Sequence, residues 1–459
     1  MTADLLVTGG DVVTMNARRE VLVGGAVAVA GEAILGVGAT SALRAAHPHA
    51  PELDARGCVV IPGMVNAHQH LTGDPLARSS IPDDLPPGAS IFEWSVPLHG
   101  AHTAADDDIS ATLSAAESLR LGVTTVVEAG TVAHPTVVGE AMERTGLRGT
   151  VGTWGWDLAQ GPFVAPWQEV LERQRAVLER FPTGGRVTGW VTLVGHGLAS
   201  DALLAGAADL ARSATTGMTM HMSPTKADPE VYLARTGRRP LLHLERLGVL
   251  GPHLLLAHAV WLDDAEIDAL LRSDTAVASC PWAYLRLGQG VTRAGRHAEI
   301  VSRGGRLGLG CDASNAGDQM DILRAAALFA GLARDTAVDP MCFTAHAAFE
   351  LATIAGARAV GMGDHIGSLE PGKQADLVVL DASGPEWTPR GEVGLQLVWS
   401  ADGRCVRDVL VAGRQVVRDR RCLTVDEQAL RAEATERARS LRERAGVVVR
   451  HRWPLIPSE

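Results

Sequence analysis

Apolar, β-branched stretches alternate with amphipathic helical stretches through the middle of the chain. Eight short stretches have the composition of buried strands, at residues 63–70, 124–130, 149–156, 189–196, 217–223, 253–261, 275–281 and 306–314. Helical periodicity fills most of the intervals, for example at residues 107–122, 166–181, 200–214 and 263–273. Near-continuous apolar strands that alternate with helices indicate a parallel sheet buried on both faces. Eight such units in about 300 residues favour an α/β fold with a closed (β/α)8 barrel of the TIM type.

The two ends of the chain carry a different pattern. Short strands with glycine turns are expected at residues 5–10, 11–16, 24–38 and 58–63, and again at residues 367–382 and 406–420. Neither end is large enough to form a core alone, so we expect both to pair in one small β-sandwich domain. The predicted domains are a β-sandwich of residues 1–62 plus 366–424, a barrel of residues 63–365, and a C-terminal helix and tail of residues 425–459.

Composition narrows the class of protein. With 459 residues the chain is long enough for a barrel and a smaller domain. A net charge of −11 argues against a nucleic acid or an anionic membrane as partner. The first residues lack the basic and apolar regions of a signal peptide, and the six cysteines include no CxxC pair. We therefore expect reduced thiols and a cytoplasmic location.

Polar side chains occur where the predicted barrel strands end. The first strand ends in His68 and His70, whose i, i+2 spacing places both imidazoles on one face, within reach of one ion. The fifth, sixth and eighth strands end in His221, His258 and Asp312. Because functional side chains of a barrel enzyme converge at the carboxyl ends of its strands, these residues predict a metal site at one mouth.

Other strand-end residues have two interpretations. His196 ends the fourth strand and Glu128 the second, and each is either a contact to substrate or a second metal, or a hydrogen-bonded core residue. Trp94 lies in a long, lid-like connection after the first strand, although tryptophan more often packs in a core. Asp312 precedes a helical run, so helix capping competes with metal binding there. A packed strand histidine is the alternative for His258.

Four segments resemble those of one enzyme family. Residues 60–70, VIPGMVNAHQH, are similar to the segment that opens the barrel in the amidohydrolase superfamily. Residues 254–264, LLLAHAVWLDD, and 306–314, RLGLGCDAS, resemble its strand-six and strand-eight segments. Residues 367–381, GSLEPGKQADLVVLD, resemble the return into its β-sandwich. The resemblance covers nearly the whole chain in order, and it is greatest to the cytosine deaminase and triazine hydrolase branch, which uses one metal.

The resemblance implies a role for each strand-end residue. One divalent metal ion, Zn2+ or Fe2+, would be bound by four residues: His68, His70, His221 and Asp312. Asp312 would also carry a proton from the attacking water, and His258 would hydrogen-bond that water or the substrate. Three imidazoles and a carboxylate accept either metal. No lysine ends the fourth strand, which favours a single ion. The resemblance further implies a homo-oligomer.

The chain departs from this branch in two segments. A glutamate usually stands three residues after the strand-five histidine, where this chain has Pro224. Asp228 and Glu230 follow closely, and either could supply the carboxylate. In the strand-seven segment, Trp282 offers a flat surface and Tyr284 a phenol for substrate contact.

These residues predict a hydrolase that cleaves a non-peptide C–N bond of a small, nitrogen-containing, heterocyclic substrate. Water activated by the metal would attack an sp2 carbon, with deamination as one form of the reaction. Since the strand-five glutamate is replaced, hydrolysis of an amide, urea, carbamate or aryl substituent is an alternative. A second alternative is a non-catalytic scaffold protein. The convergent metal ligands argue against it, because a scaffold has no physical need for them.

Overall fold

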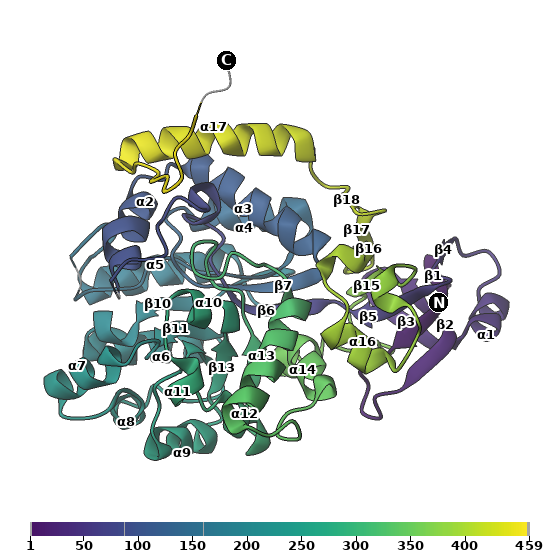
Figure 1. Ribbon diagram of the computed structural model, residues 1–459, viewed down its shortest axis with the longest axis horizontal. Helices are drawn as coiled ribbons and strands as arrows, with labels where there is room; N and C mark the ends of the chain where they lie inside the picture. Colours follow the sequence, from purple (N-terminus) through teal and green to yellow (C-terminus); the bar gives the residue numbers. More distant parts are fainter. Residues whose placement is uncertain (1, 87, 159, 457–459) are drawn as a thin grey trace.

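The computed structural model describes residues 2–86, 88–158 and 160–456 of the protein. An α/β barrel forms the larger part of the molecule, and a sheet built from both ends of the chain lies at one side (Figure 1). A long C-terminal helix crosses one end of the barrel (Figure 1). This arrangement agrees with the expected fold class.

The barrel has eight parallel staves. Its strands are β6 (Met64–Gln69), β7 (Val123–Glu128), β8 (Arg148–Val151), β9 (Val187–Gly189), β10 (Val191–Gly195), β11 (Met218–Met222), β12 (Leu254–His258), β13 (Ala276–Ser279) and β14 (Leu307–Leu309). Strands β6 to β9 form one sheet and β10 to β14 another. Only Trp190 separates β9 from β10, so these two strands together form the fourth stave. All eight predicted strands are confirmed.

Main-chain hydrogen bonds close the barrel between its first and last staves. The amides of Cys311 and Asp312, just after β14, donate to the carbonyl of His68 at 3.1 and 2.9 Å. Gln69 and Asp312 also form an isolated parallel bridge. The closure therefore lies within the segments predicted to bear metal ligands.

Helices follow the staves and cover the barrel. They are α2 (Val96–Gly100), α3 (Ala104–Arg120), α4 (Pro135–Thr145), α5 (Trp167–Arg180), α6 (Asp201–Ser213), α7 (Ala227–Thr236), α8 (Pro240–Arg246), α9 (Asp264–Arg272), α10 (Pro281–Arg286), α11 (Val291–Ala294), α12 (His297–Ser302), α13 (Ile322–Ala337), α14 (Ala345–Ala352) and α15 (Ile354–Ala359). Acidic residues stabilise the first turns of two of these helices: Asp106 belongs to the capping box of α3, and Asp263 caps α9.

Strands from both ends of the chain share one nine-stranded sheet. They are β1 (Leu5–Val13), β2 (Val21–Ala30), β3 (Ala33–Ala39), β4 (Glu52–Asp54), β5 (Cys58–Pro62), β15 (Leu377–Asp381), β16 (Val406–Val411), β17 (Arg414–Arg418) and β18 (Arg421–Cys422). Strand β5 pairs antiparallel with β15 and so joins the two ends. Helix α1 (Thr40–Ala46) packs on β1, β2 and β3, whereas α16 (Val393–Trp399) packs on α13 and α14. The expected pairing of both ends is confirmed, and the exact domain limits stay a prediction.

One local expectation at the N-terminus is wrong. Residues 5–10 and 11–16 were expected to form two strands, but β1 runs through both segments. The register of its pairing with β2 shifts on either side of Gly10, and Gly9 has a φ of +83°. The glycines therefore form an irregularity within a strand instead of a turn, as glycine permits at positive φ.

The C-terminal helix, α17 (Glu427–Ala445), packs on α3 and on the connection between β6 and α3 (Figure 1). Leu98 of α2 and Leu441 of α17 belong to one buried apolar cluster. The guanidinium of Arg444 bonds Asp106 of α3 at 2.5 Å. The helix predicted within residues 425–459 is thus confirmed, and it covers the lid-like first connection of the barrel.

Two further features concern the surface and the thiols. Among the residues that the structure describes, no helix has both the length and the apolar character needed to cross a membrane. The six cysteines are free, and five of them are buried. These thiols have no disulfide role in the described part of the chain.

Candidate metal centre

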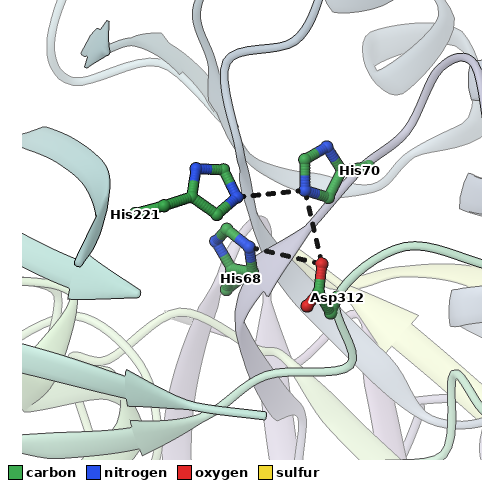
Figure 2. A group of neighbouring side chains, drawn as sticks. All are labelled: His68, His70, His221 and Asp312. Carbon is green, nitrogen blue, oxygen red and sulfur yellow. Dashed lines mark hydrogen bonds and ion pairs between the residues drawn. The ribbon is translucent and has the colours of Figure 1, made fainter. Parts of the chain in front are cut away.

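Four predicted ligands meet at the mouth of the barrel. One donor atom from each of His68, His70, His221 and Asp312 lies within 4.8 Å of the other three. The side chains come from β6, the residue after β6, β11 and the segment after β14, and they point toward one another in Figure 2. Residues more than 240 positions apart in the chain therefore meet because the barrel closes on itself.

The donor atoms of the four residues lie at hydrogen-bond or ion-pair distances from one another. Asp312 Oδ1 lies 3.4 Å from His70 Nε2 and 3.6 Å from His68 Nε2. The Nε2 atoms of His70 and His221 are 3.3 Å apart (Figure 2). His68 and His70 leave the same face of β6, as their i, i+2 spacing predicts.

Hydrogen bonds outside the cluster orient two of the imidazoles. Nδ1 of His221 donates to the carbonyl of Val194 at 2.5 Å, which leaves its Nε2 as a lone-pair acceptor. Nδ1 of His70 bonds the hydroxyl of Thr131 at 2.7 Å. Metal-binding histidines commonly use their outer nitrogen in this way, which fixes the ring and the tautomer.

The cluster fits a divalent cation. Both ring nitrogens of His68 are buried and have no hydrogen-bond partner, an uncommon state for a buried polar group. Nε2 of His221 likewise points toward Nε2 of His70, which is itself a candidate metal ligand. A cation bound by three nitrogens and one carboxylate oxygen would satisfy all of these atoms.

Burial and the charges of the cluster together set its protonation states. Asp312 outweighs burial at His70 and raises the pKa of that imidazole, whose proton a bound cation would displace. At His221 burial dominates and lowers the pKa well below its usual value, so this imidazole is neutral. Burial alone would raise the pKa of Asp312, but the adjacent imidazoles of His68 and His70 outweigh it and hold that pKa well below its usual range. Neutral imidazoles and an ionised carboxylate are the forms that bind metal.

Cys280 is the other potential ligand nearby. It forms a group of possible donors with His258 and Asp312. Burial raises the pKa of its thiol well above the usual value. Since the thiolate is the form that binds metal, a protonated Cys280 is the weaker candidate, and the four-residue donor set stays a prediction.

His258 lies beside the cluster in a strained backbone conformation. Its Nε2 is 3.8 Å from Asp312 Oδ2, and its φ is +75°. The His258 carbonyl accepts hydrogen bonds from Nε2 of His297 at 2.6 Å and from the hydroxyl of Tyr284 at 3.4 Å. Positive φ at a non-glycine residue costs about 1–3 kcal/mol and tends to occur at functional sites. Burial lowers the pKa of His258 to about 3, so its ring is neutral.

The structure places the two weaker strand-end candidates in buried positions around the cluster. His196 bonds the carbonyl of His221 through Nδ1 at 3.3 Å. Glu128 is fully buried, and one of its carboxylate oxygens accepts from the amide of Gly130 at 2.6 Å. Burial raises the pKa of Glu128 to about 7. Contact of either residue with substrate stays a prediction.

The two carboxylates after β11 occupy the start of α7. Asp228 accepts hydrogen bonds from the amide and the hydroxyl of Thr225, at 2.7 and 2.9 Å. Glu230 is exposed on α7. Asp228 thus has a local structural role. It lies four residues beyond Pro224, the position at which the related enzymes carry a glutamate.

The aromatic candidates divide between core and surface. Tyr284 is fully buried, and its hydroxyl accepts from the amide of Cys280 at 2.7 Å. Trp282 is half-buried and packs under the guanidinium of Arg324. Trp94 packs in the apolar cluster beneath α17. Substrate contacts by these three rings stay predictions.

Sequence reasoning missed a second polar group beside the cluster. Donor atoms of Asp74 and His99 lie within 4.8 Å of each other and of one from His70. Both side chains are buried, and both belong to the connection between β6 and α3. In the sequence, this group could have been noticed from Asp74, which follows the predicted ligand His70 by four residues.

Together, the barrel and the donor cluster define a metal-dependent hydrolase. The family model described as "Amidohydrolase family" matches residues 59–416. The 5-methylthioadenosine/S-adenosylhomocysteine deaminase of Syntrophobacter fumaroxidans is 32% identical over 428 residues, which cover 92% of this chain and 95% of the relative. The chain therefore belongs to the amidohydrolase family, and it is an enzyme that hydrolyses C–N bonds other than peptide bonds.

Solved structures agree with this assignment. A zinc-bound adenosine deaminase from Xanthomonas campestris has a TM-score of 0.91 and 29% identity, over 97% of this chain and 99% of that one. An atrazine chlorohydrolase from Arthrobacter aurescens TC1, complexed with zinc, has a TM-score of 0.85 and 22% identity, over 95% of this chain and 100% of that one. The second likeness shows the fold alone. The expected resemblance to the family is confirmed, and a divalent metal is its cofactor.

Proposed function

We propose that this protein is a zinc-dependent deaminase of a purine nucleoside or a related nitrogen heterocycle. The observation that carries the proposal is the convergence of four donor atoms within 4.8 Å at the mouth of the barrel. The deaminase names of the relatives and the zinc in a structural neighbour support the substrate class and the metal. Iron is the alternative metal for the same donors.

The proposed ligands are His68, His70, His221 and Asp312. A divalent ion bound there would lower the pKa of a water molecule to about 7 and would so supply a nucleophile at neutral pH. The Asp312 carboxylate accepts a proton from the attacking water and passes it to the leaving nitrogen. His258, with its neutral ring 3.8 Å from that carboxylate, hydrogen-bonds the atom on which charge develops.

Ammonia release tests the proposal. The zinc-loaded protein is incubated with 5′-methylthioadenosine, S-adenosylhomocysteine, adenosine and guanine, and ammonia is measured with an enzyme-coupled assay. At least one compound is expected to release ammonia, and Asp312→Asn to abolish the release. A protein that binds zinc yet releases no ammonia from any of them would contradict the deaminase assignment.

One observation favours a second candidate reaction. Pro224 stands where related deaminases carry a glutamate, and Asp228 is bonded locally. Hydrolysis of an amide, urea, carbamate or aryl substituent places less demand on a separate acid, so such compounds form the next panel. A homo-oligomer, a cytoplasmic location, and the absence of nucleic-acid and membrane partners stay predictions.

A further inference from the structure

The connection between β6 and α3 carries a buried carboxylate and a buried imidazole next to the proposed metal ligands. The side chains of Asp74 and His99 are each only 5% exposed. One donor atom of each lies within 4.8 Å of one from His70. Such burial of two polar groups is costly unless they have partners or a function.

Asp74 is fixed by the neighbouring segment of the barrel mouth, which follows β14. Its Oδ1 accepts a hydrogen bond from the amide nitrogen of Asn315 at 3.0 Å. Asn315 lies three residues after Asp312, so the carboxylate is anchored to the segment that carries a proposed metal ligand. The remaining oxygen, Oδ2, lies 3.8 Å from Nε2 of His99. This separation is too long for a direct hydrogen bond, so Asp74 acts on His99 chiefly by its charge.

The neighbouring backbone leaves room for the His99 ring. Gly73 has a φ of +76°, and a Cβ atom there would lie 2.1 Å from Cε1 of His99. On another side the ring of Trp154 packs edge-on, with ring centroids 5.2 Å apart. Gly73 and Trp154 thus define one position for this imidazole.

Two helices hold the segment that carries His99. Leu98, its neighbour in α2, packs in one apolar cluster with Leu441 of α17. His102 bonds the carboxylate of Asp107 in α3 at 2.7 Å, and His134 bonds the same carboxylate at 2.8 Å. The position of His99 is therefore fixed from both sides of the chain.

A second metal site does not explain these side chains. His70 already directs Nε2 toward Asp312 at 3.4 Å and Nδ1 toward Thr131 at 2.7 Å. Without His70 only one carboxylate and one imidazole would remain, and zinc sites use at least three protein ligands. The pair is better explained by a polar contact to a molecule bound at the metal.

We propose that His99, oriented by Asp74, contacts the substrate at the metal centre and donates a hydrogen bond to it, in place of the strand-five carboxylate that this chain lacks. The inference rests on the proposed function for the identity of the substrate. No covalent bond forms or breaks at His99. Burial outweighs the charge of Asp74 and lowers the pKa of His99, so the ring is neutral and has one N–H.

The test uses zinc-loaded protein and acetohydroxamate, a small molecule whose oxygens bind zinc whatever the natural substrate. Variants are His99→Ala and His99→Gln, which keeps an N–H donor. His134→Gln, in the connection between β7 and α4, is the control. Zinc content and Tm are measured for each. With unchanged zinc content and Tm, His99→Ala is expected to bind acetohydroxamate about tenfold more weakly, the value of one hydrogen bond. His99→Gln should retain part of the acetohydroxamate affinity that His99→Ala loses. His134→Gln should bind acetohydroxamate as tightly as the parent protein does.

Equal acetohydroxamate affinities for the parent protein and His99→Ala would overturn the proposal. With 5′-methylthioadenosine as substrate, His99→Ala is expected to lower kcat by about 100-fold and to change KM much less, because the contact strengthens as charge develops. If the parent protein releases no ammonia from any compound of the panel, the deaminase assignment fails, while the acetohydroxamate comparison still decides the role of His99.

Discussion

The amide of Asp312 donates a hydrogen bond to the carbonyl of His68 at 2.9 Å, while their side chains face each other at 3.6 Å. The same two residues therefore close the barrel and offer donors to the proposed metal. Binding of the metal and closure of the barrel should stabilise each other, because an ion that binds only the folded state shifts the unfolding equilibrium.

Metal removal is the first prediction. Chelation is expected to lower Tm, and the loss of free energy of unfolding is about 4 kcal/mol when zinc had been present at about a thousand times its Kd. The affinity of His68→Ala for zinc should be at least about tenfold lower, because loss of a residue that only hydrogen-bonds a ligand already lowers metal affinity by about 10–100-fold. Metal analysis and calorimetry check both effects. The exposed His346 supplies a control: His346→Ala should keep full zinc content.

Replacement of Asp312 by asparagine separates proton transfer from folding. The amide has nearly the same shape and cannot accept a proton at neutral pH. Turnover should fall by about 100-fold or more, the usual contribution of general acid–base catalysis, while the circular dichroism spectrum stays unchanged. A variant with full kcat would show that another group carries the proton.

The carboxylates after β11 are expected to matter little. Asp228 is bonded to Thr225, and Glu230 is exposed. Asp228→Asn and Glu230→Gln should each change kcat by less than about threefold, far below the 10²-fold of a lost acid. A large drop in either variant would assign it the role of the missing glutamate.

His297 gives the protein a dependence of stability on pH. Burial lowers its pKa to about 4, against 6.5 in the unfolded chain. The contribution of neutral His297 to the free energy of unfolding is complete above pH 6.5. It is lost as the pH falls from 6.5 through 4, because only the unfolded state binds a proton on this histidine between these two values. The loss amounts to about 3 kcal/mol at most. His297→Gln keeps an N–H for the His258 carbonyl but cannot titrate.

Urea unfolding of both proteins at pH 7.5 and pH 5 measures this difference. The free energy of unfolding should fall further in the parent protein than in His297→Gln. Equal falls in the two proteins would exclude His297 as the source.

A buried ion pair joins the barrel to the nine-stranded sheet. Arg148 of β8 bonds Asp376, one residue before β15, at 2.7 Å, and both side chains are at most 10% exposed. Arg148→Met leaves a buried carboxylate without its partner and should cost about 3–5 kcal/mol. The exposed pair of Arg390 and Asp11 is the control, and Arg390→Met should cost less than about 1 kcal/mol. Similar losses in both variants would contradict this account.

The sequence predicted the staves and their polar ends with good accuracy. Each of the eight strands was visible as a short apolar run, because strands buried on both faces show little polar interruption. His68, His70, His221 and Asp312 were recognisable by their position at strand ends. The single strand β1 was not, because glycines that bulge a strand look the same in sequence as glycines that turn it.

The sequence by itself determined the alternation of strands and helices, the pairing of the two chain ends, and the residue types of the candidate metal centre. Only the tertiary structure decided which of the polar residues meet. Asp74, Asn315 and His99 come together because closure of the barrel brings the segments after β6 and β14 side by side. Local periodicity carries information over a few residues, whereas a contact such as that of Asp74 with Asn315 depends on packing across the whole fold.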